Sequence, residues 1–419
     1  MKLSKYNIEF EDNGKRYIFN SHSLAIAQID DNVTSGDIEQ SELDDLYENG
    51  IFVDDVDEEL ALKNEYWETV CSSKIMYLSI MPTLSCNLRC PYCFEHHNEL
   101  NMTREIADKL IDVIVNKIEE EKLEMLKVDW YGGEPTLRMD VITYISERIL
   151  EICRHYDIEY ISSITTNATI IDSIKAKQLL DAKITNMQIT IDGPKEVHDK
   201  RRVGIKGEPT FDRIIKFIEQ NKDNFNIVIR INMDKNNENA VDELLFFLSK
   251  KGFTNIPITI KGVVSSEERD VSATEVAGKE LADLIYRKNS YAMDLGLSLA
   301  IFQSFEISPS RFCVVDCQNQ FIVAPDGRLF KCGESYLDKD PGYIGNIDLS
   351  SGEMKVDDIK ANKWIKDPFE IEKCANCKIL PMCFGGCQMK KNVKNAEACN
   401  VDLKYHLVDY LKLYMRLLS

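Results

Sequence analysis

The feature that most constrains the fold of this chain is a repeated alternation of short apolar strands with longer amphipathic helices, which begins at Ile75. Strands are expected at 77–80, 127–131, 160–165, 187–191 and 227–231, and helices at 105–122, 140–154, 173–182 and 211–222. Repeated strand–helix units form a parallel sheet or barrel. In such folds the chemistry gathers at the carboxyl ends of the strands, where the loop starting at Pro82 lies.

The regions before and after this alternation have a different character. Asn13-Gly14 separates two alternating runs and predicts a β-hairpin. A capped helix at 41–47, a strand at 51–53 and a second helix from Asp57 complete a small winged module. From about Ser304 the alternation fades and cysteines become frequent. We therefore expect three domains, at 1–72, 73–303 and 304–419.

Charge and cysteine content exclude several classes of protein. The net charge is −19, and residues 1–74 carry 18 acidic against 6 basic side chains, so a nucleic-acid partner is not expected. The acidic stretch either attracts a basic ligand or only aids solubility. With no apolar stretch that could span a membrane and no signal peptide, we expect a cytoplasmic protein without a membrane partner. Its 13 cysteines then suggest metal or cluster ligation.

One loop has the spacing of an iron–sulfur site. Cys86, Cys90 and Cys93 form a C-x3-C-x2-C motif, whose three thiolates can reach three corners of a cubane cluster. The fourth iron is then left without a protein ligand, and an open iron of this kind can be chelated by the amino and carboxylate groups of S-adenosylmethionine (SAM), whose cleavage yields a 5′-deoxyadenosyl radical. The alternative is a zinc knuckle completed by His96 or His97.

This loop and the motifs after it resemble the radical SAM superfamily over residues 75–232. Gly132-Gly133-Glu134-Pro135 is similar to the glycine-rich motif that receives the SAM ammonium. Thr165-Thr166-Asn167 resembles the ribose-contacting segment, with Ala168 where the family has glycine. The resemblance implies a partial (β/α)6 TIM-like barrel and these SAM contacts: Tyr92, Gly132, Gly133, Glu134, Pro135, Thr166, Asn167, Thr190 and Arg202.

The segment from Thr190 to Arg202 resembles one in the peptide-modifying branch of the superfamily, where a hydroxyl and an arginine hold the SAM carboxylate. Arg201 is an alternative to Arg202, and Asp192 is expected to shape the turn. Arg230 and Asn232 are read either as barrel packing or as SAM or substrate contacts.

A second group of cysteines resembles the SPASM extension of this superfamily, which binds two auxiliary [4Fe–4S] clusters. By that resemblance the first cluster is held by Cys313, Cys317, Cys332 and Cys387, and the second by Cys374, Cys377, Cys383 and Cys399. One or two zinc ribbons are the alternative. Cys71 and Cys153 fit no motif and are expected to be buried thiols. The resemblance thus implies SAM, three [4Fe–4S] clusters and a reductant such as flavodoxin or ferredoxin.

Three function classes follow. In the first, the enzyme matures a ribosomally made peptide by an oxidative thioether or carbon–carbon crosslink. Residues 1–72 resemble a leader-recognition domain, to which the leader peptide adds a strand. The second is a sulfatase-type maturase that oxidises Ser or Cys to formylglycine. Its family has Asp after the cysteine that matches Cys332, where this chain has Gly333 and then Glu334. The third, a non-enzymatic iron–sulfur or zinc adaptor, leaves the SAM motifs unexplained.

Overall fold

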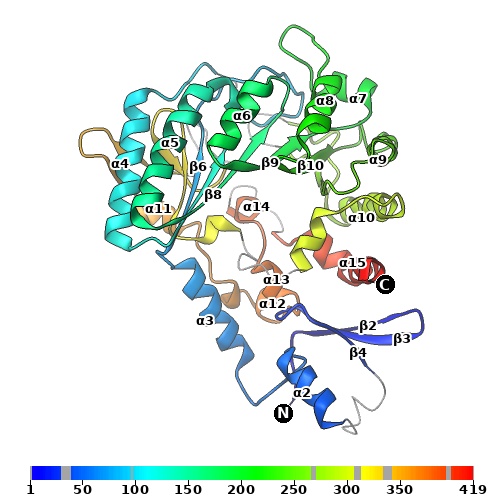
Figure 1. The fold of residues 1–419 in the computed structure, drawn as a ribbon. Coiled ribbons are helices and arrows are strands. Elements are labelled where there is room, and N and C mark those ends of the chain that lie inside the picture. Colours follow the sequence, from blue (N-terminus) through cyan, green and yellow to red (C-terminus); the bar gives the residue numbers. More distant parts are fainter. Residues whose placement is uncertain are drawn as a thin grey trace. The chain divides into compact units, whose positions relative to one another are not determined.

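The computed structural model describes residues 2–29, 39–95, 98–265, 270–305, 313–333, 342–392 and 398–418, which group into two compact units (Figure 1). One unit joins 1–71 with 301–316 and 366–419, and the other joins 72–300 with 317–365. The third expected domain, 304–419, has parts in both units. The division into three domains stays a prediction.

The larger unit is built on six parallel strands that lie in sequence order. They are β6 (Ile75–Ile80), β7 (Met125–Trp130), β8 (Glu159–Thr166), β9 (Ile184–Thr190), β10 (Asn226–Met233) and β11 (Ile258–Gly262). The helices between and after them are α4 (Arg104–Glu121), α5 (Met139–Tyr156), α6 (Ser173–Asp181), α7 (Lys195–Arg201), α8 (Phe211–Asn221), α9 (Val241–Lys250) and α10 (Gly278–Asp294). This arrangement confirms the expected six-fold strand–helix architecture of a partial barrel.

Local patterns explain these elements. In β7, Leu126, Val128 and Trp130 are buried, whereas the alternating Lys127 and Asp129 are partly accessible on the other face. Helix α4 begins where the Thr103 side chain accepts a hydrogen bond from the Ile106 N–H at 3.3 Å. Each strand therefore has one buried face that packs against the helices and one face that points into the barrel.

The same sheet continues into the cysteine-rich region. Strand β12 (Gln320–Val323) pairs in parallel with β6, and β13 (Arg328–Phe330), β14 (Tyr343–Asp348) and β15 (Glu353–Val356) add antiparallel strands to make a ten-stranded sheet. A short helix, α11 (Asp358–Asn362), follows. The sequence did not predict this extension, because strands of three to six residues carry little periodic signal.

The N-terminal part of the smaller unit contains the expected hairpin. Strands β2 (Asn7–Asp12) and β3 (Lys15–Asn20) are joined by Asn13 and Gly14, whose φ angles of 49° and 74° suit a tight hairpin turn. Strand β4 (Ile26–Ile29) adds a third strand, and β1 (Lys2–Leu3) pairs with β5 (Phe52–Val53). Helices α2 (Gln40–Glu48) and α3 (Glu58–Val70) complete this segment.

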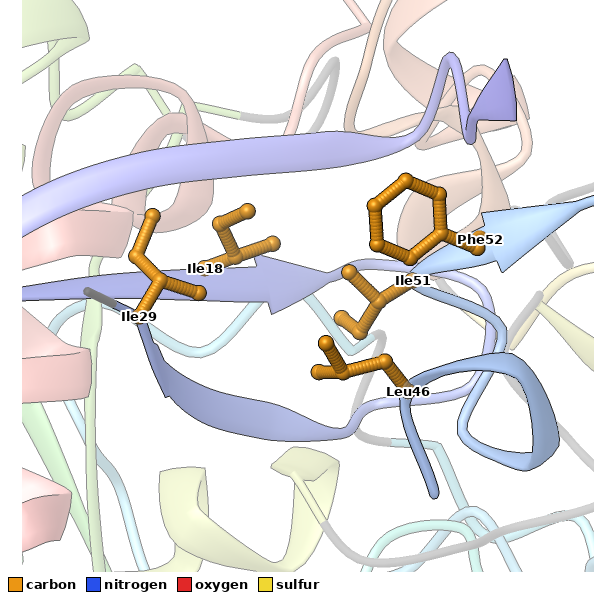
Figure 2. Close-up of a cluster of buried hydrophobic side chains, with 5 residues drawn as sticks. All are labelled: Ile18, Ile29, Leu46, Ile51 and Phe52. Carbon is orange, nitrogen blue, oxygen red and sulfur yellow. The ribbon is translucent and has the colours of Figure 1, made fainter. Parts of the chain in front are cut away.

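A small hydrophobic core holds this N-terminal segment (Figure 2). Its buried members are Ile18, Ile29, Leu46, Ile51 and Phe52. They come from β3, β4, α2, β5 and Ile51, the residue just before β5, so the hairpin and the helix share one core.

The rest of the smaller unit is helical. Its helices are α12 (Glu372–Ala375), α13 (Leu380–Cys383), α14 (Gln388–Asn392) and α15 (Val401–Leu418). The long α15 packs Tyr414 against Phe302 and Phe305, with ring centroids 5.5 and 5.7 Å apart. Across the described residues, we found no helix of the length and apolarity that a bilayer crossing requires.

Candidate active site

The three-cysteine loop lies at the carboxyl end of the first barrel strand. It leaves β6 and is held by backbone hydrogen bonds to the segment after α7. The Arg89 N–H donates to Val203 O at 2.8 Å, and the Ile205 N–H donates to Asn87 O at 3.1 Å. This pairing fixes the backbone on which the candidate ligands stand.

The thiols of this loop sit in a low-polarity environment. Burial raises the pKa of Cys86 and of Cys93 to about 12, and it also raises the pKa of Cys90. Thiols in such surroundings stay protonated unless a cation compensates their charge. Iron ions would provide that charge, so the donor set fits a cluster.

No three described His, Cys, Asp or Glu side chains converge tightly enough to hold one metal ion. A cubane cluster spreads its thiolates more widely than a single ion does, so its assignment to Cys86, Cys90 and Cys93 does not need such a convergence. The alternative zinc ligands, His96 and His97, lie outside the described residues.

The glycine-rich segment after β7 packs directly on the cysteine loop. The Gly133 N–H donates to Thr83 O at 3.1 Å, and the Glu134 N–H donates to Ser85 O at 2.8 Å. A Cβ on Gly133 would lie 2.3 Å from Ser85 O, and one on Gly132 would lie 2.5 Å from Thr83 O. Glycine is needed here because two backbones approach too closely for any side chain.

Glu134 lies buried between this segment and the end of β8. Its carboxylate accepts hydrogen bonds from the Thr136 N–H (3.1 Å), the Thr166 hydroxyl (2.7 Å) and the Asn167 N–H (2.7 Å). The structure thus brings Glu134, Thr166 and Asn167 together. A carboxylate with several donors holds its negative charge at a fixed position, where it can also receive an ammonium.

Asn167 links the end of β8 to the cysteine loop. Its side-chain amide donates to Asn87 Oδ1 at 2.9 Å, and the Asn87 amide donates to the Thr169 hydroxyl at 2.8 Å. Ala168 has a φ of 56°, a left-handed conformation in which glycine is favoured. The family glycine is therefore replaced here by a residue that keeps the glycine-like backbone.

Tyr92 joins the cysteine loop to the opposite side of the barrel through its hydroxyl. It donates to the Asp192 carboxylate and accepts from Arg202 Nη1 at 2.7 Å. Asn232 binds the same pair, with its N–H 2.9 Å from Asp192 Oδ1 and its amide 3.5 Å from the Tyr92 hydroxyl. Asp192 is thus a charged member of the site, which extends its expected role in the turn.

The Arg202 guanidinium has unused binding capacity. Its side chain is buried, and its Nε has no hydrogen-bond partner among the described residues. Although burial opposes the charge, Tyr92, Cys90 and Asp192 hold the pKa of Arg202 well above its usual value. Arg201 pairs with Asp234, with Nη1 3.0 Å from Oδ1, and its Nε likewise has no hydrogen-bond partner among the described residues.

A buried histidine positions this arginine. His198 Nδ1 accepts from the Asp192 N–H at 3.3 Å, and Nε2 lies 3.1 Å from the Thr210 hydroxyl, which donates to Arg202 O at 2.6 Å. Burial lowers the pKa of His198 to about 3, so the ring is neutral and can bridge these groups. The sequence motif contained His198, but its spacing alone did not reveal this link.

The remaining barrel candidates lie close by. Thr190 ends β9 and is buried beside its register partner Arg230 on β10. Arg230 Nε donates to Asn232 Oδ1 at 2.9 Å, which connects it to the Tyr92 network. Pro135 is buried and begins the short 3-10 turn Pro135–Arg138. The geometry therefore favours a site role for Asn232 over simple packing.

Sequence reasoning missed one carboxylate inside the barrel. Asp129 lies on β7, with Ser79 and Ser163 as its register partners on β6 and β8, and it accepts a hydrogen bond from Ser163 at 2.8 Å. Burial raises its pKa to about 6. The alternating pattern of β7 was a usable signal, because every second residue there faces inward.

The second cysteine group is divided between the two units. In the smaller unit, Cys374, Cys377, Cys383 and Cys399 lie within electrostatic range of one another, and burial raises the pKa of Cys383 to about 11. The Cys387 N–H donates to Ala398 O at 2.9 Å, which places Cys387 next to the backbone that directly precedes Cys399. Four thiols in one small region fit a fully ligated cluster.

The candidate ligands of the first auxiliary cluster fall into two pairs. In the larger unit, the buried Lys331 Nζ donates to Cys317 O at 2.6 Å, which ties Cys317 to the residue before Cys332. In the smaller unit, Cys313 lies within electrostatic range of Cys387. Glu334, the alternative base beside Gly333, lies outside the described residues.

The two cysteines without a motif differ in their surroundings. Cys153 is buried, as expected, and burial raises its pKa to about 11. Cys71 is exposed at the end of α3, so the prediction of a buried thiol was wrong there. The apolar residues before it, Tyr66 and Val70, are buried on α3, whereas Cys71 is the C-cap that follows this helix.

Comparison with known proteins agrees with this geometry. Residues 80–248 match the sequence model of the radical SAM superfamily. Together with the cysteine loop and the glycine-rich segment, this match shows that the chain contains a radical SAM domain and is an enzyme. The proteins that it resembles include sulfatase-maturating enzymes and a mycofactocin maturase.

Three similar proteins give the extent of this likeness. A cysteine-type anaerobic sulfatase-maturating enzyme of Clostridium perfringens is 26% identical over 361 residues, which is 80% of this chain and 95% of that protein. The structure of anSMEcpe with AdoMet and the Cp18Cys peptide has a TM-score of 0.62 at 24% identity, covering 82% of this chain and 98% of that one. Streptococcus suis SuiB bound to its precursor peptide SuiA has a TM-score of 0.50 at 15% identity, covering 96% and 98%.

Proposed function

We propose that this radical SAM enzyme oxidises a side chain of a polypeptide substrate. The observation that carries the proposal is the buried network of Tyr92, Asp192 and Arg202 beside Cys90, which leaves one guanidinium N–H free to bind an anion. When bound, the cluster and SAM supply a 5′-deoxyadenosyl radical that removes a hydrogen atom from the substrate.

The residues of this chain have separate tasks in the proposed site. Cys86, Cys90 and Cys93 would hold three irons. Arg202, kept in place by Tyr92 and by the His198–Thr210 link, would bind the SAM carboxylate. Arg202, His198 and Thr210 are buried, so they keep water away from one side of the place where a reactive radical would form.

Glu134, fixed by its three donors, would receive the SAM ammonium, and Thr166 and Asn167 would line the ribose. Thr190 would add a hydroxyl contact at the end of β9. Gly132, Gly133 and Pro135 would shape the backbone, because these residues bring the glycine-rich segment onto the cysteine loop.

The first candidate reaction is the oxidation of a Cys or Ser residue to formylglycine. It is supported by the sulfatase-maturating relative, which matches over 95% of its own length. This finding favours the formylglycine reaction over the crosslink that we placed first from the sequence. Gly333 is the departure, and its surroundings would accept a side chain, because an added Cβ would lie 3.6 Å from Ile322.

The second candidate is a thioether or carbon–carbon crosslink in a ribosomally made peptide. It is favoured by the N-terminal hairpin segment, since the SuiB fold likeness covers 96% of this chain and so includes most of residues 1–71. The anSMEcpe likeness covers 82%. In this reaction residues 1–72 would bind the leader of the peptide at a sheet edge.

Both candidates remove a second electron after the hydrogen abstraction. We propose that two auxiliary clusters, held by the eight cysteines of the second group, accept it, and that flavodoxin or ferredoxin supplies the electron that starts the reaction. Full ligation by four cysteines each would leave no iron free to bind substrate.

One experiment separates the candidates. The reconstituted enzyme is incubated anaerobically with SAM, reductant and either a cysteine-containing sulfatase peptide or the small peptide encoded beside this gene. A product that loses the cysteine sulfur and gains a hydrazide-reactive carbonyl supports the first candidate. A product lighter by two hydrogens, with its thiol consumed, supports the second. If Cys93→Ala still forms 5′-deoxyadenosine, the cluster assignment fails.

A further inference from the structure

The cysteine segment of the smaller unit is bonded directly to the N-terminal hairpin. Lys378 follows Cys377 in sequence, and its Nζ donates to Asn7 O, at the start of β2, at 2.8 Å. The Lys378 carbonyl accepts a hydrogen bond from the hydroxyl of Ser21, which directly follows β3. One residue beside a candidate cluster ligand therefore holds the open end of the hairpin.

Helix α3 is attached to the same segment at a second place. The hydroxyl of the fully buried Tyr66 donates to Lys366 O at 3.0 Å, and its ring stacks on Phe384 at 5.0 Å with an interplanar angle of 18°. Lys63 pairs with Asp367 at 2.7 Å. Phe384 directly follows Cys383, so this contact also ends at a candidate ligand.

Phe384 has a φ of 41°, which is unfavourable for a residue with a side chain. A strained backbone persists only where its surroundings hold it. Here Tyr66 covers the ring on one side, and the Cys383 ligand would fix the chain on the other.

Neither the N-terminal segment nor the cysteine segment has much stability of its own. Residues 2–71 form a segment of about 70 residues whose hairpin and α2 share a cluster of only five buried side chains, and segments of that size are marginal without other support (Figure 2). The cysteine segment contains two helices of four residues, too short to persist alone. A segment of this kind gains its structure from the metal that its cysteines bind.

We propose that the second auxiliary cluster, held by Cys374, Cys377, Cys383 and Cys399, keeps the N-terminal hairpin folded and so controls whether the peptide can bind. The proposal rests on the proposed function only in assigning peptide binding to residues 1–72. A chain without this cluster would lose peptide binding even though its radical SAM site is intact.

The test uses the full-length reconstituted enzyme and follows amide hydrogen exchange in residues 7–20. Cys377→Ala is expected to speed exchange there at least tenfold. Cys90→Ala, which removes a candidate ligand of the SAM-binding cluster, is expected to leave it unchanged. Equal protection of the hairpin in Cys377→Ala and wild type would overturn the proposal.

A milder variant guards against general misfolding. Lys378→Met keeps all cysteines and the iron content but removes the bond to Asn7, so exchange near β2 should rise roughly tenfold, as for one lost charged hydrogen bond. Lys250→Met, on the outer helix α9, is the control and should change nothing. An unchanged hairpin in Lys378→Met would count against the coupling.

Peptide binding is measured in parallel with a fluorescein-labelled copy of the peptide encoded beside the gene. Cys377→Ala should weaken binding at least tenfold, and Cys90→Ala should not. If wild type does not bind this peptide, the leader-recognition assignment fails, while the exchange data still decide whether the cluster holds the hairpin.

Discussion

Replacing Gly133 by alanine tests whether the glycine-rich segment must touch the cysteine loop. The new Cβ would lie 2.3 Å from Ser85 O and 2.7 Å from Leu84 O, so the two backbones must separate by about 1 Å. That movement breaks the hydrogen bonds from Gly133 N–H to Thr83 O and from Glu134 N–H to Ser85 O. At about 1–2 kcal/mol for each lost bond, we expect a loss of about 2–4 kcal/mol.

The loss would be measured as a lower Tm of the cluster-free chain, by about 5–15 °C for a unit of this size. Because Ser85 precedes Cys86, the reconstituted variant should also lose the SAM-dependent change in the EPR signal of its reduced cluster. Gly333→Ala is the matched control, since its Cβ would meet Ile322 at 3.6 Å, an ordinary contact. A Gly133→Ala protein with the Tm and EPR response of wild type would refute the close-approach argument.

Three further substitutions test other parts of the site. Arg202→Lys should weaken SAM binding about 10- to 100-fold in calorimetry, because an ammonium cannot bond to Tyr92 and to the SAM carboxylate with the geometry of the buried guanidinium. Unchanged affinity would contradict the proposed role of Arg202. Burial raises the pKa of Asp129 from 3.8 to about 6, so its ionisation destabilises the fold progressively as the pH rises from about 4 to 6; Asp129→Asn should therefore raise stability by about 3 kcal/mol at pH 7 and not below pH 4, as seen in Tm against pH. Lys366→Met removes a buried positive charge near Cys313 and Cys383, so an auxiliary cluster should become harder to reduce in an EPR redox titration, with iron content as the control.

The sequence was most informative where the structural signal is local. The Asn13-Gly14 turn and the strand–helix alternation depend on neighbouring residues, and both were predicted correctly. Strand β9 begins at Ile184, three residues before the expected start, because strand ends carry weaker patterns than strand centres.

The parts that the sequence did not predict depend on contacts between distant residues. The pairing of β12 with β6 joins Gln320 to Tyr77, and no periodic pattern records such a partner. The Tyr92–Asp192 bond and the His198 link are likewise invisible in spacing, although all three residues belong to recognisable motifs. The motifs thus predicted which residues belong to the site, but the hydrogen bonds between them could be seen only in the fold.

The parallel pairing of β12 with β6 has a practical consequence for any attempt to dissect this enzyme. A fragment ending near residue 303 would keep the six barrel strands but expose the outer edge of β6, whose Tyr77 and Met81 N–H groups bond to Asn319 O and Val323 O in the intact chain. An exposed strand edge recruits other chains and favours aggregation. Truncated proteins made for crystallisation or reconstitution should therefore retain residues 317–365, even where the auxiliary clusters are of no interest.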